Sequence, residues 1–274
     1  MLSTVKYRYS SLEDFLISNP LSVDAQLDDG WGALYPVKGR EVNAAVLFSD
    51  MSSFSQRTLS LSPTETLIFV NNFFAWVTAE ALRRTHGIID KYIGDEMMIV
   101  FSDEFGSEDP FQEAVQTARW MAENDCFDFR PHMGIACGIV TIGFVGTPLK
   151  YSCSAFGLPV TLAKRCAGMK SDEPGYATIT FPAEVWAGHS LEAVLPPRKQ
   201  KRSDGTVVEE RQSWELIPPR RVELKNMPPV EIQQIVNRVV NIPSQSAEEG
   251  AKEALAGLRR KGIYRPYGAQ SIRG

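Results

Sequence analysis

Apolar residues recur along this chain with two periods, one typical of helices and one typical of strands. Ser62-Pro63-Thr64-Glu65 has the features of a helix start, with Ser as the cap, Pro at the first position and Glu at the third. Apolar residues then follow at helical spacing: Ile68, Phe69, Phe73, Trp76, Val77 and Leu82. Arg83-Arg84 and Gly87 are typical of a helix end. The pattern predicts a helix that ends by Gly87.

Three further helices are predicted. One begins near Asp109-Pro110 and ends near residue 124, and another opens at Gly157-Leu158-Pro159 and continues through Cys166. After Pro243 the composition becomes polar, and residues 247–261 have the pattern of one amphipathic helix.

Runs with strand character lie between these helices. Residues 88–92 and 97–101 predict a hairpin with Gly94-Asp95 at its tip, and glycines interrupt the apolar run 132–146, which fits strands with close backbone packing. Residues 198–202, followed by Asp204-Gly205, have the features of a basic, exposed hairpin or loop. The other strand-like runs are 41–50, 177–181, 213–217, 222–224 and 230–236. Strands that alternate with helices and are partly joined by hairpins predict an α+β sandwich with helices on one face.

The composition limits the size and class of the protein. With 274 residues and 43% hydrophobic content, the chain can bury one sizeable core with an appendage, or two small domains. We expect residues 1–40 to be a lead-in that packs on a main domain at 41–240, and residues 241–274 to form a polar tail. The net charge of −4 argues against a general nucleic-acid binder.

Several classes of protein are disfavoured. The four cysteines show no CxxC pairing and the three histidines are scattered, so neither a zinc site, nor a disulfide scaffold, nor a histidine metal cluster is indicated. The first residues lack the apolar core of a signal peptide, and no uninterrupted apolar run reaches membrane-spanning length. We therefore expect a soluble, cytoplasmic protein without a membrane partner.

Two aspartates occupy matching apolar settings. Asp50 follows Ala44-Ala45-Val46-Leu47-Phe48-Ser49, and Asp95 lies at the predicted hairpin tip. In each case a strand-like run delivers a carboxylate to a tight turn, where an unpaired carboxylate is costly to bury. Two carboxylates that meet at one sheet edge would suit hard divalent cations, which also bind phosphates. The alternative is that both are ordinary turn aspartates.

Five motifs between residues 41 and 235 occur in a characteristic order. They are Phe48-Ser49-Asp50-Met51-Ser52-Ser53-Phe54, Lys91-Tyr92-Ile93-Gly94-Asp95, the glycine pairs 134/138 and 143/146, Val160-Thr161-Leu162-Ala163-Lys164-Arg165, and Lys225 in a Val-Glu-Leu-Lys-Asn-Met segment. In residues and order they resemble the class III nucleotide cyclase catalytic domain. The resemblance implies a ferredoxin-like or palm-like α+β sandwich with a mixed, mostly antiparallel sheet, and places the catalytic domain at 41–240.

The resemblance also implies a reaction and a metal site. Such domains convert a nucleoside triphosphate to a 3′,5′-cyclic nucleotide and pyrophosphate, using two divalent ions, Mn²⁺ or Mg²⁺. Asp50 and Asp95 would bridge both ions, with the carbonyl of Met51 as a further ligand. The backbone amides that would hold the β- and γ-phosphates belong to Ser52, Ser53 and Phe54.

Two basic residues match the catalytic groups of the family. Arg165 would stabilise charge on the α-phosphate, and Lys225 would neutralise the triphosphate. The alternatives are a solvated helix arginine and an ordinary strand-end lysine. In this family the site lies between two catalytic domains, one giving the aspartates and the other giving the arginine, so one domain per chain implies a homodimer.

Departures from the family pattern concern the nucleobase. Adenylate cyclases pair the hairpin lysine, here Lys91, with Asp or Thr at the position of Ser154, and guanylate cyclases have Glu at the lysine position. Thr161 replaces the ribose-orienting asparagine. Lys91 and Ser154 could recognise adenine or a pyrimidine edge. The chain looks most similar to the pyrimidine cyclases of bacterial antiphage (Pycsar) systems, which implies UTP or CTP as substrate, with ATP as the alternative, and a separate effector activated by cyclic UMP or cyclic CMP.

Rival functions come from other classes. A pseudocyclase that only binds nucleotide would normally have lost an aspartate or the arginine, and Asp50, Asp95 and Arg165 are all present. A diguanylate cyclase would need a Gly-Gly-Asp/Glu-Glu-Phe loop, which the hairpin sequence Ile93-Gly94-Asp95-Glu96-Met97 does not match. A structural dimerisation domain would bind neither divalent metal nor triphosphate.

Overall fold

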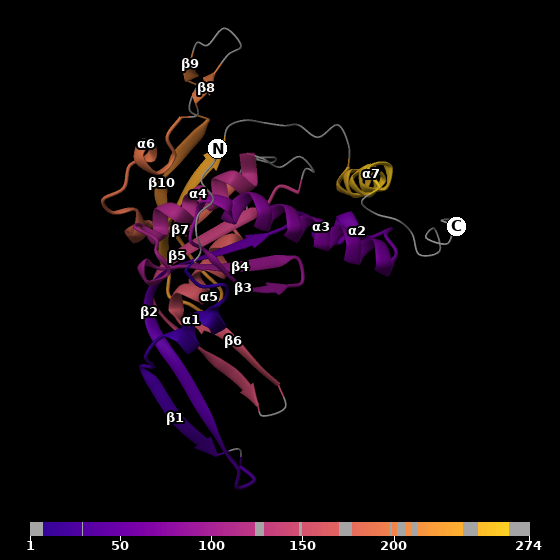
Figure 1. Cartoon of the computed structure of the whole chain (residues 1–274). Coiled ribbons are helices and arrows are strands. Elements are labelled where there is room, and N and C mark those ends of the chain that lie inside the picture. Colours follow the sequence, from indigo (N-terminus) through magenta and orange to yellow (C-terminus); the bar gives the residue numbers. More distant parts are fainter. Residues whose placement is uncertain are drawn as a thin grey trace.

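One large mixed sheet organises the chain. The computed structural model describes residues 8–28, 30–123, 129–147, 150–169, 177–197, 199–201, 207–209, 213–237 and 246–262. The strand order is β10-β11-β7-β5-β2-β4-β3, with β1 added on β2 and β6 on β5 (Figure 1). Their bounds are β1 Val23–Asp28, β2 Leu34–Asp50, β3 Ile88–Ile93, β4 Glu96–Phe101, β5 His132–Thr147, β6 Lys150–Phe156, β7 Thr178–Pro182, β10 Trp214–Val222 and β11 Val230–Asn237. Among these described strands only β5 and β7 pair in parallel, so the predicted mixed, mostly antiparallel α+β architecture is confirmed.

Helices cover both faces of the sheet, so the prediction of helices on one face is wrong. Side chains alternate across β2: Ala45 and Leu47 join one apolar cluster, while Val46 and Phe48 join another. The first cluster contains α3 (Pro63–Ala81), α4 (Pro110–Glu123) and α7 (Ala247–Arg260). The second contains α1 (Leu12–Ser18) and α5 (Leu158–Ala167). Because β2 is apolar throughout its buried part, the sequence alone does not indicate that helices pack on both faces of the sheet.

The predicted helices occur close to their expected positions. Ser62 and Glu65 form the reciprocal capping box at the start of α3, which ends in a short 3₁₀ turn, Leu82–Arg84. Ser246 and Glu249 form the same box at α7. Three short helices were not predicted, namely α1, α2 (Phe54–Thr58) and α6 (Leu191–Val194), and two further 3₁₀ turns lie at Asp103–Phe105 and Ala183–Trp186. No helix in the described ranges is both long and apolar enough to span a membrane.

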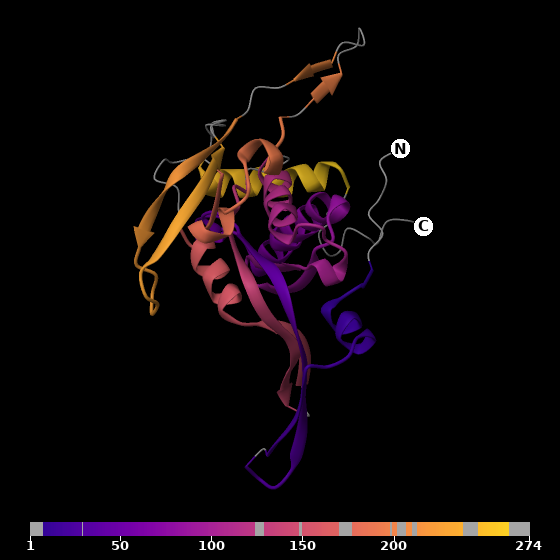
Figure 2. The same ribbon diagram turned by 90° about the vertical axis from the view of Figure 1, so that its left-hand side faces the viewer.

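The sheet extends well beyond the body as an arm, because β2 and β5 are longer than their apolar cores. β2 begins at Leu34 rather than at the predicted residue 41 and pairs with β1, while β5 is one strand that continues into a hairpin with β6. These strands project together from the body (Figures 1 and 2). Large apolar side chains such as Trp31, Leu27 and Leu34 are exposed there. With no buried face, this segment lacks the alternation that marks a half-buried strand.

The C-terminal half also differs from the predicted boundaries. β10 runs through residue 222 as one strand with an irregularity between Ile217 and Arg220, where the sequence predicts two strands. The predicted basic hairpin is present as the antiparallel pair β8 (Lys199–Lys201) and β9 (Val207–Glu209), while its turn lies outside the described residues.

Candidate functional site

The two aspartates meet at one edge of the sheet. Asp50 is the last residue of β2, and its Cα is paired with that of Glu96 at the start of β4. Gly94 adopts a positive φ of 66° in the turn between β3 and β4, which glycine allows without strain. This turn sets Asp95 beside Asp50, and the two carboxyl groups are hydrogen-bonded.

Crowding of acidic groups changes the protonation of this pair. Burial, followed by the hydrogen bond and charge of Asp95 and by the charge of Glu96, raises the pKa of Asp50 from 3.8 to about 7, while Lys164 opposes the shift. Without a cation, Asp50 therefore keeps its proton up to near neutral pH. A hard divalent cation prefers carboxylate oxygens and would neutralise the crowded negative charge, so the residues present fit such an ion.

The chain turns sharply directly after Asp50. Met51 is buried, and the Ser52 amide donates to the carbonyl of Phe129 at 3.2 Å. Ser53 is left-handed, with φ 57° and ψ 33°, and α2 begins at the next residue. The Ser52 amide therefore already donates to a protein acceptor, which differs from the expectation that it holds phosphate.

A cleft of about 290 Å³ lies beside Asp50. Its lining includes three acidic and three basic side chains, namely Asp50, Glu96, Glu223, Lys164, Arg165 and Lys225. The expected catalytic residues Arg165, on α5, and Lys225, just after β10, therefore share one cleft with Asp50. Gly134 allows α5 to approach, since an added Cβ on it would come within 2.1 Å of the α5 backbone.

Lys164 and Glu96 are cleft residues that sequence reasoning missed. The Lys164 ammonium is paired with the Glu96 carboxylate and lies 5.7 Å from the centroid of the Phe48 ring. The signal in the sequence was weak, because Lys164 precedes the motif arginine and Glu96 follows the motif aspartate, with nothing to indicate that α5 brings the two together.

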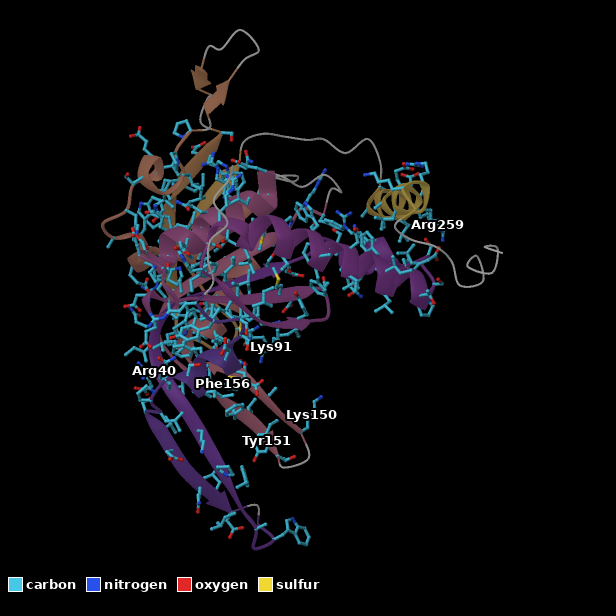
Figure 3. All side chains as sticks on the ribbon, viewed as in Figure 1. Arg40, Lys91, Lys150, Tyr151, Phe156 and Arg259 are labelled. Carbon is cyan, nitrogen blue, oxygen red and sulfur yellow. The ribbon has the colours of Figure 1, made fainter. Side chains whose placement is uncertain are left out.

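The expected base-recognition residues cluster around another carboxylate. Ser154 on β6 is fully buried, and its hydroxyl donates to Asp90 at 2.7 Å. The Lys91 ammonium is 3.6 Å from the same Asp90 oxygen and 5.9 Å from the centroid of the Phe156 ring (Figure 3). Asp90 sits at a bulge of β3, between Ile89 and Lys91, which turns it toward β6.

Burial raises the pKa of Asp90, while the hydrogen bond from Ser154 and the charge of Lys91 lower it. Lys91 and Ser154 are thus neighbours, but neither is among the described residues that line the cleft beside Asp50. Thr161 is exposed on the first turn of α5.

Comparison with known proteins gives relatives for half of the chain. No family model matches the sequence. An uncharacterized protein of Mycobacterium tuberculosis is 30% identical over 140 residues, which cover 50% of this chain and 26% of that protein. An uncharacterized protein of Mycobacterium bovis is 28% identical over 139 residues, again 50% of this chain and 26% of the relative. The chain spans about a quarter of the length of these curated relatives.

Solved structures show the fold. The adenylyl cyclase CyaB from P. aeruginosa superimposes with a TM-score of 0.55 at 20% identity, covering 75% of this chain and 99% of that one. The guanylyl cyclase Cya2 gives 0.51 at 20% identity, covering 76% and 97%. The guanylate cyclase domain of RhGC from Catenaria anguillulae, in complex with GTP, gives 0.54 at 17% identity, covering 73% and 100%. The chain therefore has the fold of class III adenylyl and guanylyl cyclase domains.

Proposed function

We propose that this chain is a nucleotide cyclase, which converts a nucleoside triphosphate to a 3′,5′-cyclic nucleotide and pyrophosphate. The observation that carries the proposal is the hydrogen-bonded pair Asp50–Asp95 beside a cleft that also holds Arg165 and Lys225. An acidic pair beside a cleft that is lined by basic residues is the arrangement that triphosphate chemistry requires. An ordinary turn aspartate at position 50 would have no reason to share a cleft with two basic residues.

The acidic side of the cleft would hold divalent metal. Asp50, Asp95 and the Met51 carbonyl would be the protein ligands, for Mn²⁺ or Mg²⁺. When bound, the ions would lower the pKa of the ribose 3′-hydroxyl and would bind the triphosphate. Asp50 must lose its proton to bind them, which couples metal affinity to pH.

The basic side would act on the phosphates. Arg165 stabilises the charge that develops on the α-phosphate, and Lys225 neutralises the triphosphate. The Lys164 ammonium, which is paired with Glu96, adds a third positive charge to the lining of the cleft. The amides of Ser53 and Phe54 complete the phosphate contacts.

We propose that the active unit is a homodimer. Asp50 lines the cleft of its chain, whereas Lys91 and Ser154 are not among the described residues that line it. A nucleotide bound between two copies could contact the cleft of one chain and the Lys91–Ser154 cluster of the other. This arrangement differs from the composite site that the sequence resemblance implies, because Asp50 and Arg165 line the cleft of one chain. A two-fold axis would still produce two equivalent sites.

The base-recognition proposal favours a pyrimidine triphosphate, UTP or CTP, with ATP as the second candidate. Lys91 can donate to a ring nitrogen or carbonyl. Ser154 gives its only proton to Asp90, so toward any other group its oxygen acts as an acceptor. A cyclic pyrimidine nucleotide would serve as a second messenger in antiphage defence and would act on a separate effector protein. Thr161 would contact the ribose.

The product identifies both the reaction and the base. Purified protein is incubated with Mn²⁺ and each of ATP, GTP, CTP and UTP, and products are identified by mass. The proposal predicts a cyclic nucleotide and pyrophosphate, with UTP or CTP used fastest. Mainly cyclic AMP would retain the cyclase and reject the pyrimidine assignment, and no cyclic product from any triphosphate would reject the function.

A further inference from the structure

Arg57 is a buried arginine that lies directly behind the loop after Asp50. It belongs to α2 and is only 2% exposed. Its Nε donates to the carbonyl of Ser52 at 2.7 Å. A guanidinium is rarely buried unless it makes specific contacts, because its desolvation is costly. The contact to Ser52 is therefore a built feature of the loop.

Two hydrogen bonds hold two successive peptide units of this loop. In a trans peptide the carbonyl and the amide point in opposite directions. The Ser52 amide donates to Phe129, so the Met51 carbonyl in the same unit points away from Phe129. The Ser52 carbonyl accepts from Arg57, so the Ser53 amide in the next unit points away from Arg57. The Met51 carbonyl, an acceptor, and the Ser53 amide, a donor, therefore both point away from the groups that anchor the loop.

The loop conformation needs such support. Ser53 has φ 57°, a left-handed conformation that is unfavourable for a residue with a side chain. Its side chain does not cap α2, although α2 starts at the next residue. The hydrogen bonds to Phe129 and Arg57 fix the two peptide units that precede the strained residue.

Helix α7 closes over Arg57 from the C-terminal end of the chain. A Cβ added to Gly250 would lie 3.9 Å from the Arg57 Nη1 atom, so the guanidinium rests against the first turn of α7. Ala251, Leu255 and Leu258 are buried in the same apolar cluster that Phe54 of α2 contacts. Arg259 forms a 2.8 Å ion pair with Glu65 of α3 (Figure 3). The polar tail therefore contributes a helix to the wall behind the loop.

We propose that Arg57 is a positioning residue for the metal and triphosphate loop Met51–Phe54, and that α7 holds Arg57 in place. The inference rests on the proposed function, because that function makes the Met51 carbonyl a metal ligand and the Ser53 amide a phosphate donor. Arg57 touches neither metal nor substrate in this account. It fixes the Ser52 peptide. When α7 packs on the body, it holds the Arg57 guanidinium in place and so stabilises the loop.

Hydrogen exchange tests the positioning without metal or nucleotide. Exchange of the amides in residues 51–54 is measured by mass spectrometry in the full chain, for wild type, Arg57→Met, Arg57→Lys and Leu255→Ala. Arg260→Met is the matched control, since Arg260 pairs with Glu253 on α7 itself. We expect about 10-fold faster exchange in Arg57→Met, partial recovery in Arg57→Lys, and faster exchange in Leu255→Ala. Arg260→Met should exchange like wild type.

Metal binding supplies the second readout. Titration with Mn²⁺ alone, followed by electron paramagnetic resonance, should show affinity lowered about 10-fold in Arg57→Met and restored in part by Arg57→Lys. The KM for the Mn²⁺–triphosphate complex should rise more than kcat falls, whereas the ranking of the four triphosphates should stay the same.

The outcomes separate this inference from the proposed function. Wild-type exchange in both Arg57→Met and Leu255→Ala overturns the inference, whatever the activity. If Arg57→Met does not fold, Leu255→Ala and Arg57→Lys decide in the same assay. Wild-type protein that binds no Mn²⁺ and forms no cyclic nucleotide rejects the proposed function, and the exchange data still determine whether Arg57 and α7 hold the loop.

Discussion

Replacing Asp50 by Asn should stabilise the metal-free protein above neutral pH. The folded pKa of Asp50 is raised from 3.8 to about 7, so the folded state binds a proton that the unfolded chain releases. Between pH about 4 and 7 the unfolding free energy of the wild type therefore falls as pH rises. An amide at this position carries no charge and can still donate to Asp95.

The size of the effect follows from the shift. At ~1.36 kcal/mol per pKa unit, the full shift is worth about 4 kcal/mol as an upper bound. Asp50 is partly exposed and solvent screens its charge, so we expect about 1–2 kcal/mol at pH 8. For a chain of this length that corresponds to a Tm raised by about 2–8 °C.

Thermal unfolding in EDTA from pH 4 to pH 8 measures this effect. Asp28→Asn is the matched control, because Asp28 is an exposed strand-end aspartate that accepts from the Gly30 amide. The Asp50→Asn advantage should be absent near pH 4, appear as pH rises, and shrink when Mn²⁺ is added, since the ion stabilises only the intact pair. An advantage that is flat with pH, or a loss of stability at pH 8, would refute the electrostatic reasoning.

Further predictions concern the cleft, the dimer and the base. Mixing Asp50→Ala chains with Arg165→Ala chains should restore no activity, because Asp50 and Arg165 line the cleft of one chain and neither cleft of the heterodimer is intact; recovery of roughly a quarter of wild-type activity under random exchange would mean that each site takes its aspartates from one chain and its arginine from the other. Lys91→Ala and Ser154→Ala should each alter the ranking of the four triphosphates, since a lost hydrogen bond at a buried polar edge costs about 1–3 kcal/mol; an unchanged ranking would mean that the base is recognised elsewhere. Gly134→Ala should lower both Tm and activity, because the new Cβ would push α5 and its arginine away from the sheet; wild-type values for both would contradict the packing argument.

Local signals predicted the elements that position the site. The capping residues Ser62 and Glu65 identified the start of α3, and Gly94 marked the turn that carries Asp95. These features act within a few residues of the chain, so they are visible without tertiary structure. The meeting of Asp50 and Asp95 was also expected, since each lies at the end of an apolar run. Their role as metal ligands remains a prediction.

Features that depend on tertiary contacts could not be predicted from the sequence. In the sequence, Arg57 has the features of a solvated helix residue. In the structure it is covered by α7, which begins nearly two hundred residues later. In the sequence Asp90 is one more strand residue, whereas in the structure a bulge in β3 turns it toward Ser154. The Asp90–Ser154 contact also has a consequence at the position where adenylate cyclases have Asp or Thr: Ser154→Asp would set a second carboxylate against the buried Asp90. These contacts are set by packing, which propensities do not encode.

The most direct test of the account is the cyclic product formed with Mn²⁺ by three proteins: wild type, Asp95→Ala and Asp28→Ala. Both substitutions remove a turn aspartate at a strand end, but only Asp95 is bonded to Asp50 beside the cleft. The account predicts a cyclic nucleotide and equimolar pyrophosphate from wild type and Asp28→Ala, and loss of turnover in a folded Asp95→Ala protein. Equal turnover by all three proteins would contradict it.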